Sequence, residues 1–535
     1  MTACDAGRGQ ITHRDSSQTD DTGRTQVPVT EVSSLCAASI DWSTGDSSLL
    51  PPYYLEGDTV NLTLRCTGNV EAHRVRFVPL EIPNDSLWSD IDNQLTLVSD
   101  ASSGGRYDIM FSVQISEDTD FPETIETSFW IGDNPDITGA IPPEPLEYTE
   151  EWGLPVFHVE SDGSIGNSYE PTIIIFDGVR YEAEIQKRGA VSIYYPKNSY
   201  GLRFANEEID LEDYGIEQRR DHLVLISPFD DNSYIRQRLI YELWYEMSAY
   251  WQVPRLTPRT FFAVVYLDGE YFGLYTASDR IDNEFVMNMG LNEDGNLYKA
   301  VNHDANFYLT TSGGAAKTTL AAGYEKKEGE PESGEGAFDD LIELVSMTGS
   351  SSPHDFNLVA DEWIQTDEFM DWYWLIQISS AYDSAGKNSY LYNDPTDDQP
   401  FRFAPWDFNY AWGQDWRTLR IDTDNDNDLT DTNAIFAHFL WGNSEALISR
   451  YQQMRTDGPL AENWLIDKTN EYVHLLGPAI DRDWERWADS HQNYGGWEAS
   501  RNSSGDWTTP EEEILYLQEW LIQRGQFLDS WTGDF

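Results

Sequence analysis

The amino-acid sequence predicts an α+β protein whose first part is rich in strands and whose last part is helical. Short alternating apolar runs between Gly, Asn, Asp and Ser fill residues 36–132, and similar runs return in residues 153–301. Residues 433–535 instead carry apolar side chains at helical spacing. A stretch rich in Pro and acidic residues, 133–150, separates the two strand regions. We therefore expect a disordered tether (1–35), a small Ig-like β-sandwich (36–132), a linker (133–150) and a larger α+β domain (151–535).

The chain is strongly acidic. Its 535 residues include 94 Asp and Glu against 34 Lys and Arg, a formal net charge of −60. Phosphate backbones and anionic membrane surfaces both require a basic partner, so this charge argues against nucleic acid as a partner and against docking on an anionic membrane surface. Few of the basic residues are Lys. The aromatic fraction of 13% supplies enough apolar material for a folded core. This combination favours a halophilic protein, because salt screens self-repulsion; an ordinary acidic secreted protein is the alternative.

Three cysteines, all within the first 66 residues, bear on location. Cys4 follows Thr-Ala and precedes the polar tether, which resembles the end of a lipoprotein signal and predicts a lipid anchor there. A Cys36–Cys66 disulfide is a second prediction and would fit an extracellular or cell-surface location. The absence of Cys-x-x-Cys argues against structural zinc, and the sequence has no apolar run of about 18 residues that would span a membrane.

The first strands of the larger domain carry an unusual concentration of positive charge. Asp177-Gly178 marks a tight turn between two strands. Four cations then fall within a short stretch: Lys187, Arg188, Lys197 and Arg203. Gly189 would let backbone N–H groups approach a bound anion. This pattern predicts a phosphate clamp, with a solvated strand face as the alternative.

A helix is predicted to follow the strand 222–229, with Asp230–Ser233 as its cap. Its apolar stripe comprises Ile235, Leu239, Ile240, Leu243, Trp244 and Met247. Arg236 and Glu242 lie off this stripe, which is compatible with simple exposure. An ion pair with a phosphate-binding cation is the alternative for Glu242 or Glu246.

The middle of the chain mixes strands with helices. Asp268-Gly269 predicts a β-hairpin within 260–282, and residues 296–301 predict a further strand. Residues 309–355 are rich in Gly, Ser and Glu and predict a mobile insertion with one helix. Residues 361–383 predict a buried apolar helix that ends at Asp383.

The local geometry of the next segment, residues 383–413, predicts that three polar side chains lie close together. Two apolar runs, 389–392 and 401–404, flank a turn-rich polar stretch and predict a β-hairpin. Asn388 begins the first strand and Asp407 follows the second, so both lie at one edge, close to Asp383. Two carboxylates and an amide at one place suit a Mg²⁺-nucleotide site, because hard cations prefer oxygen ligands.

Two features follow the hairpin. Carboxylates alternate through residues 422–431 and predict a Ca²⁺ site or, by default, a solvated acidic loop, because the EF-hand Gly and Glu are missing. Thr509 as the N-cap residue and Pro510 at the first helical position predict the start of the last helix.

Six ordered blocks within residues 151–535 resemble the CotH (spore coat protein H) kinase family of atypical protein kinases. They are GLPVFHVE, KRGAVSIYYPKNSYGLRF, LISPFDDNSYIRQRLIYELW, YLDGEYFGLYTASDRID, DSAGKNSYLY with FRFAPWDFNYAWG, and EWLIQRGQFL. The resemblance implies a kinase-like fold of two lobes, with antiparallel strands in the N-lobe and helices in the C-lobe. It does not cover the first 150 residues.

The resemblance also implies roles, with ATP and Mg²⁺ or Mn²⁺ as cofactors and a Ser/Thr protein as acceptor. Asp383 would orient or deprotonate the acceptor hydroxyl. The residues implied to hold the metal are Asn388, Asp407 and Asn409. The residues implied to bind the nucleotide are Arg188, Lys197, Arg203, Glu242 and Asp279.

The chain departs from the family pattern at several of these positions. Asn409 stands where the family has a second Asp, so a ligand oxygen remains but a charge is lost. Arg203 replaces the usual Lys, and the two are not interchangeable at a phosphate. Asp279-Arg280 replaces Glu-Lys in the hinge-like hairpin, and Ala381-Tyr382 precedes Asp383 where protein kinases have His-Arg.

Three functions compete on these grounds. The first is an extracytoplasmic protein kinase that transfers the ATP γ-phosphoryl group to Ser or Thr. The second is a surface protein with a degenerate kinase fold that serves as a binding or structural module. The third is a carbohydrate-acting enzyme with paired carboxylates, which only the many Trp and Asp residues support.

Overall fold

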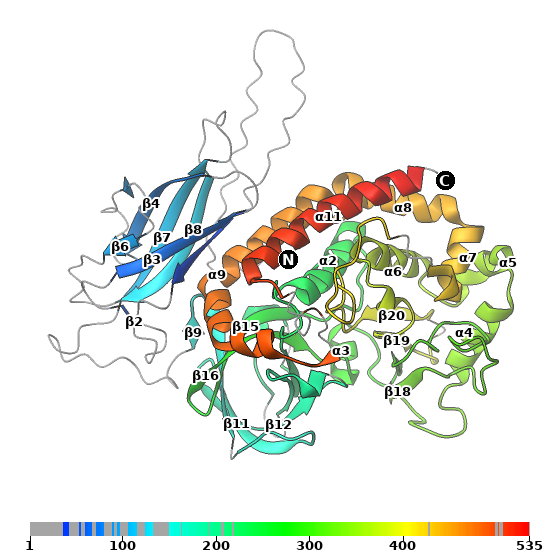
Figure 1. Ribbon diagram of the computed structural model, residues 1–535. Coiled ribbons are helices and arrows are strands. Elements are labelled where there is room, and N and C mark those ends of the chain that lie inside the picture. Colours follow the sequence, from blue (N-terminus) through cyan, green and yellow to red (C-terminus); the bar gives the residue numbers. More distant parts are fainter. Residues whose placement is uncertain are drawn as a thin grey trace, which may run out of the picture.

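The computed structural model describes residues 149–535, apart from short gaps, and the strands within residues 36–131. The gaps are residues 162, 191, 205–207, 217–218, 398, 426–428, 498–500, 502–506 and 534–535. The predicted tether and nearly all of the predicted linker lie outside the described residues, as does Cys4. The described part is α+β, as predicted, with most strands in its first half and most helices in its second (Figure 1).

Eight described strands form two sheets before the predicted linker. They are β1 (Cys36–Asp41), β2 (Tyr53–Tyr54), β3 (Thr59–Cys66), β4 (Glu71–Pro79), β5 (Trp88–Ser89), β6 (Gln94–Thr96), β7 (Gly105–Gln114) and β8 (Glu123–Ile131). Their orders are β1-β3-β6 and β2-β8-β7-β4-β5. The antiparallel register sets the backbone of Cys36 opposite that of Cys66, as a disulfide requires. The bond itself and the sandwich packing stay predictions, because these side chains lie outside the described residues.

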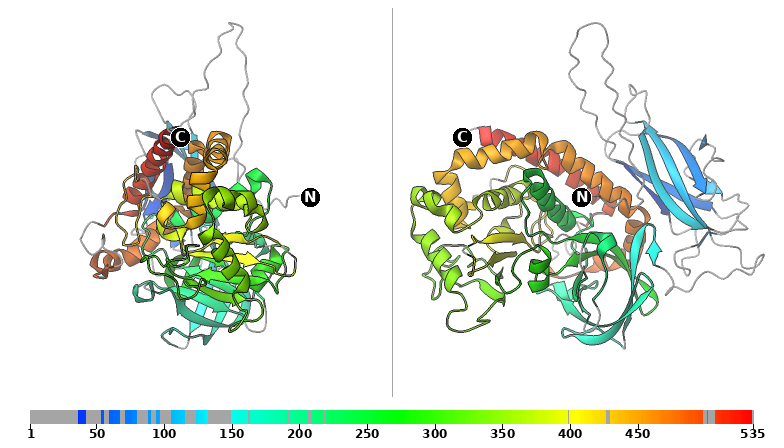
Figure 2. Two further views of the ribbon diagram at one scale, coloured as in Figure 1. Left: turned by 90° about the vertical axis from the view of Figure 1, so that its right-hand side faces the viewer. Right: turned by 180° about the vertical axis from the view of Figure 1, so that it is seen from behind.

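The next strands close into a barrel. They are β9 (Glu150–Glu151), β10 (Leu154–Ser161), β11 (Glu170–Phe176), β12 (Val179–Arg188), β13 (Ser199–Arg203), β14 (His222–Ile226), β15 (Thr260–Leu267) and β16 (Glu270–Asp279). The sheet order is β11-β12-β13-β14-β16-β15-β10-β9, and β10 also pairs with β11. This second pairing joins all the strands except β9 into a ring, and β10 and β15 run parallel within it. Figure 2 shows the curvature of β11 and β12.

Alternation of side chains fills the barrel. Alternate residues of each strand in the ring enter one buried cluster, in which the rings of Phe157 and Phe176 stack 4.2 Å apart. The other face of β10 and β15 joins the larger core that the helices cover. The turn at Asp177-Gly178 has φ of 49° and 72°, the left-handed pair that a tight hairpin of type I′ needs. The predicted hairpin is therefore confirmed, whereas its membership of a closed barrel was not predicted.

A smaller sheet lies among the helices. Its strands are β17 (Asn296–Ala300), β18 (Tyr324–Glu328), β19 (Ser389–Asn393) and β20 (Arg402–Pro405), in the order β18-β17-β19-β20. The prediction for residues 309–355 was incomplete, since the segment supplies β18 as well as α4 (Asp339–Ser350) and the start of α5 (Pro353–Val359). In α4, Leu341, Leu344 and Val345 are buried, so this segment is part of the core.

Helix α2 (Arg236–Trp251) confirms the predicted apolar stripe, every member of which is buried. The predicted cap was wrong in position: Ile235 is the N-cap residue and its side chain makes no capping bond. Asp231 takes over that function from outside the helix, because its carboxylate accepts the Arg236 N–H at 2.9 Å. Arg236 is fully buried rather than exposed. Although it lies off the apolar stripe, its guanidinium pairs with the carboxylates of Asp231, in the preceding loop, and Glu513 of α11.

The helices of the second half are α6 (Thr366–Ser379), α7 (Ala434–Gly442), α8 (Ser444–Asp457), α9 (Glu462–Asn493) and α11 (Pro510–Gly533), with the short α3 (Asn283–Asn288) earlier. Helix α9 bends at Gly477-Pro478, where φ of Gly477 is 32°, because proline cannot complete the helical ladder. Thr509 and Glu512 exchange the bonds of a capping box. Among the described helices, none is long and apolar enough to cross a membrane.

Helix α9 ties the barrel to the helical part. Lys197 Nζ lies 2.6 Å from the Asp483 carboxylate, and both side chains are almost fully buried. The Leu274 N–H donates to the same carboxylate at 2.6 Å. A Cβ at Gly273 would lie 2.5 Å from Asp483 Oδ1 and 2.7 Å from Lys197 Cε, so only glycine allows this close approach. Arg482, the residue before Asp483 on α9, forms an ion pair with Glu151 of β9.

Candidate functional site

The predicted hairpin is present as β19 and β20, and its register sets the site. Ser389 pairs with Pro405, which leaves Asn388 and Asp407 just beyond the paired residues at the same edge. The Trp406 N–H donates to the Asn388 carbonyl at 3.1 Å, and Asn388 Nδ2 donates to the Asp407 carbonyl at 3.3 Å. The hairpin register and these two hydrogen bonds therefore bring Asn388 and Asp407 together.

Both residues have left-handed backbone conformations, with φ of 54° for Asn388 and 60° for Asp407. Asn and Asp tolerate this region better than other residues with a Cβ. The Asp407 N–H donates to the Tyr241 hydroxyl of α2 at 3.2 Å, which helps to hold this conformation. Strained backbone of this kind gathers at functional sites, so the finding supports a function at this edge.

Asp383 lies in a 3₁₀ turn after α6 and is buried. Its carboxylate lies 3.0 Å from His303 Nε2 and 3.0 Å from Lys387 Nζ, and it accepts from Asn388 Nδ2 at 3.1 Å. Burial raises the pKa of Asp383, but the hydrogen bonds and charges of His303 and Lys387 outweigh burial, so the pKa lies below its ordinary value. The carboxylate is thus held ionised and oriented toward Asn388.

Two cations flank the residue before Asp407. Arg188, at the end of β12, lies with its guanidinium 5.1 Å from the Trp406 ring, and Lys299 of β17 lies 5.9 Å from the same ring. The Asp407 side chain is open to solvent. Desolvation by nearby protein raises its pKa, while the charges of Lys299 and then Arg188 oppose that change. An exposed carboxylate beside two cations is therefore available to bind a metal that carries phosphates.

Asn409 meets a carboxylate that the sequence interpretation did not assign to the site. Its Nδ2 donates to the Asp230 carboxylate at 2.6 Å. Asp230 is buried, and burial together with the charges of Asp231 and Asp407 raises its pKa to about 7. The Oδ1 atom of Asn409 is buried and has no hydrogen-bond partner among the described residues.

Two of the predicted phosphate-binding cations are held elsewhere. Lys197 is buried, donates to the Leu274 carbonyl at 2.7 Å and pairs with Asp483. Arg203 pairs with Glu184. Because Arg203 lies opposite Glu184 while Arg188 lies opposite Ser199, Arg203 is about four residues, or roughly 13 Å, further along the strands than Arg188. Of the predicted basic block, Arg188 alone is brought to Asp407 in the described structure.

The predicted acidic partners are also engaged elsewhere. Glu242 of α2 lies 3.5 Å from Lys468 of α9, and it makes no described ion pair with Arg188. Asp279 is buried at the end of β16, with its carboxylate 2.8 Å from Arg220 Nε. Burial raises the pKa of Asp279 to about 6. Both residues therefore join structural ion pairs rather than the edge that holds Asp407.

A pocket of about 1180 Å³ opens at the other end of β12. Most of its charged lining is acidic, so it repels a polyphosphate. Its charged residues are Asp177, Arg203, Glu208, Asp210, Glu212, Asp213, Arg219, Asp221 and Glu284. We therefore place the candidate site at the hairpin edge and not in this pocket.

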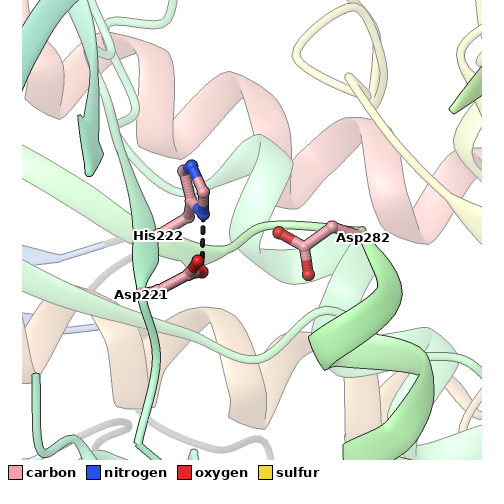
Figure 3. A group of neighbouring side chains, drawn as sticks. All are labelled: Asp221, His222 and Asp282. Atoms are coloured by element: carbon pink, nitrogen blue, oxygen red, sulfur yellow. Dashed lines mark hydrogen bonds and ion pairs between the residues drawn. The ribbon is translucent and has the colours of Figure 1, made fainter. Parts of the chain in front are cut away.

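A second group of potential metal ligands lies beside that pocket, where ligand atoms of Asp221, His222 and Asp282 are within 4.8 Å of one another (Figure 3). His222 Nδ1 and the Asp221 carboxylate are 2.5 Å apart, closer than the roughly 3 Å between two ligands of one zinc ion. Asp282 accepts from the Phe285 N–H at 3.1 Å as the cap of α3, and from buried Arg220 at 3.2 Å. These contacts account for all three side chains, which we assign a structural role.

The structure adds residues that sequence reasoning missed at the site. Lys387 stands inside the Asp383–Asn388 block, and Lys299 lies in a predicted strand; each is one of few lysines in an acidic chain, a signal that could have been used. His303 and Asp230 reach the site only through the tertiary fold. The predicted Ca²⁺ segment 422–431 includes residues 426–428, which lie outside the described residues, so that site stays a prediction.

Comparison with known proteins identifies the family of this chain. Residues 185–528 match the family model described as CotH kinase protein. The chain belongs to the CotH kinase protein family. It is also 26% identical over 257 residues to "Inner spore coat protein H" of Bacillus subtilis (strain 168). That match covers 48% of this chain and 65% of the relative, slightly less than two thirds of the relative's length.

Membership of the CotH kinase protein family implies ATP and a divalent metal, and the residues at the hairpin edge fit both. Asp407 and Asn388 offer hard oxygen ligands, and the buried Asn409 Oδ1 offers another that no described residue occupies. Arg188 and Lys299 lie on the same side of the site as Asp407 and suit phosphate oxygens. Asp383 adjoins Asn388 and suits the acceptor hydroxyl.

Proposed function

We propose that this protein is an extracytoplasmic protein kinase that transfers the γ-phosphoryl group of ATP to Ser or Thr hydroxyls of other proteins. The observation that carries the proposal is the meeting of Asp383, Asn388 and Asp407 at one edge, with Arg188 and Lys299 beside Asp407. Family membership supports the reaction class. The acceptor type and the location extend it, and the acidic composition is compatible with them.

Each residue has a distinct task in this proposal. Asp407 and Asn388 would hold Mg²⁺ or Mn²⁺, which neutralises charge on the phosphates when bound. Arg188 and Lys299 would bind phosphate oxygens and keep the nucleotide beside Asp407. Asp383 would accept a hydrogen bond from the acceptor hydroxyl and take its proton as the new O–P bond forms, while the bond between the γ-phosphorus and the bridging oxygen breaks and ADP leaves. His303 and Lys387 keep that carboxylate ionised until the hydroxyl arrives.

A binding module with a degenerate kinase fold is the second candidate. It is favoured by Asn409, whose amide carries no charge where the family has Asp, and by the engagement of Lys197 with Asp483. In this case the protein would retain nucleotide or protein binding without phosphoryl transfer.

One experiment separates these candidates. The full chain is incubated with γ-labelled ATP, Mn²⁺ or Mg²⁺ and a generic Ser/Thr protein acceptor, at low and high salt. We expect label on protein hydroxyls, and we expect a chelator to abolish it because the phosphates lose their counter-charge. A nucleotide-dependent rise in melting temperature without label transfer would support the binding module. The absence of both would contradict the nucleotide site.

Lys299 makes nucleotide affinity depend on pH. Burial, with a smaller contribution from the charge of Arg188, lowers the pKa of Lys299 to about 8. As pH rises through this value, the ammonium loses its charge and its attraction for phosphate. We therefore expect the Kd for Mg²⁺ and an ATP analogue to rise above about pH 8, by up to tenfold per pH unit.

Lys299→Arg is the matched variant for this test, because a guanidinium stays charged throughout the range. Titration calorimetry on both proteins between about pH 7 and 9 should show a flat profile in the variant. An equal loss of affinity in both proteins would mean that another group titrates.

A further inference from the structure

Asp230 lies at the junction of the barrel and the helical part. It follows β14 in the loop that leads to α2, and its carbonyl accepts from the Gln414 side chain at 2.7 Å, just beyond the hairpin. Its side chain is 4% exposed. The loop is therefore fixed against the segment that follows Asp407, and the Asp230 carboxylate is aimed at that segment.

The surroundings of Asp230 provide hydrogen bonds but no positive charge. Asn409 Nδ2 donates at 2.6 Å, and the Tyr195 hydroxyl lies 3.4 Å away. The neighbouring Asp231 pairs with Arg236, whereas no Lys, Arg or His in the described part of the chain lies within ion-pair distance of Asp230. A buried carboxylate without a cation is costly, so this position requires either a proton or a cation supplied from outside the chain.

The geometry of Asn409 links this carboxylate to the proposed metal site. Asn409 follows Asp407 by two residues and holds Asp230 through one end of its amide. The other end, Oδ1, is buried and has no hydrogen-bond partner among the described residues. Asp230 and Asn409 are therefore in contact close to Asp407 in the chain. The Asp230 carboxylate has no cation beside it, and Asn409 Oδ1 is an acceptor without a described donor.

We propose that Asp230 supplies the second carboxylate of the metal centre and so replaces the charge that is absent at Asn409. This inference rests on the proposed function, because it concerns the same metal-nucleotide site. In it, Asp407 and Asp230 provide the negative charge, and Asn409 positions Asp230 and contributes a neutral oxygen. The loss of a carboxylate at position 409 would then leave metal binding intact.

Metal binding measured directly tests the inference without reliance on turnover. Free Mn²⁺ is followed by electron paramagnetic resonance in the presence of the full chain and a non-hydrolysable ATP analogue. Asp230→Asn keeps the size of the side chain and an oxygen that can accept from Asn409, so the variant should fold. We expect it to weaken Mn²⁺ binding by about tenfold or more, because one of two carboxylates is lost.

A charge relocation separates ligation from a structural role. In the double variant Asp230→Asn/Asn409→Asp the carboxylate moves to the other partner of the same contact. We expect Mn²⁺ affinity within about threefold of the parent protein, a difference below roughly 1 kcal/mol. Asp361→Asn, which removes an exposed carboxylate, should not change affinity.

The outcomes distinguish the two proposals. Parent-like Mn²⁺ affinity in Asp230→Asn, with loss in Asp407→Asn, would overturn the role of Asp230 and leave the proposed function standing. The same result with a higher melting temperature would identify Asp230 as a buried protonated carboxyl. Absence of Mn²⁺ and nucleotide binding by the parent protein would instead overturn the proposed function itself.

Discussion

Replacement of Asp383 by asparagine should lower the rate of phosphoryl transfer by about two to four orders of magnitude, the usual contribution of a positioned general base. The amide cannot take a proton from the acceptor hydroxyl, yet its single oxygen can still accept from Lys387 and Asn388, which both contact Oδ2 of Asp383. In the proposed site the nucleotide binds on the Asp407 side, so we expect its affinity to change little. The measurement is kcat for labelled phosphate transfer, with Kd for an ATP analogue measured on the same preparation.

Asp294→Asn is a suitable control, because Asp294 is exposed and its removal changes net charge by the same amount. A kcat within about threefold of the parent in Asp383→Asn would contradict a base role. A matched fall in nucleotide affinity would instead show that the substitution disturbs Asn388 and the metal side of the site.

The largest effect on stability is expected at Arg236. Its guanidinium is fully buried and lies 2.5 Å from the Asp231 carboxylate and 2.5 Å from that of Glu513 on α11. Arg236→Ala leaves both carboxylates without this partner, so we expect the free energy of unfolding to fall by about 3–5 kcal/mol. Urea denaturation followed by tryptophan fluorescence measures it. Arg180→Ala breaks an exposed pair with Glu160 and should cost no more than about 1 kcal/mol.

The same network predicts how acid acts on the protein. Burial raises the pKa of Glu513, but the charges of Arg236 and Arg501 outweigh it and lower the pKa to about 2. Its folded-state pKa is thus below the unfolded value, so its stabilising contribution is complete above about pH 4.5 and is lost as pH falls toward 2. In Arg236→Ala this acid dependence should shrink. Equal acid dependence in both proteins would assign the transition to other carboxylates.

The hairpin could be predicted from the sequence because its geometry is local. Asn388 and Asp407 are joined by a chain that turns back on itself, so the alternation of apolar residues fixes which ends meet. The apolar stripe of α2 was predictable for the same reason, since helical spacing depends only on neighbours along the chain.

Residues whose partners are distant could not be predicted. Lys197 stands near Arg188 in the sequence, but its partner Asp483 is 286 positions away. Lys299 reaches Trp406 only because β17 pairs with β19. Arg236 was judged by its place off an apolar stripe, which gives no sign of a buried carboxylate on another helix. Each case depends on which helices and strands pack together in the fold. The spacing of residues along the chain does not give that information.

Closure of the barrel has a consequence for how the protein folds. The ring is completed where Val156 of β10 pairs with Val264 of β15, so the first strand must wait for more than a hundred residues to be synthesised before its parallel neighbour exists. Contacts so distant in sequence slow folding, and an unpaired strand edge is a template for association with other chains. Helix α9, which fastens the barrel through Lys197 and Glu151, leaves the ribosome later still. The ring can therefore close only after β16, which ends at Asp279, has been made, and nascent chains that stop before α9 should be those most in need of a chaperone.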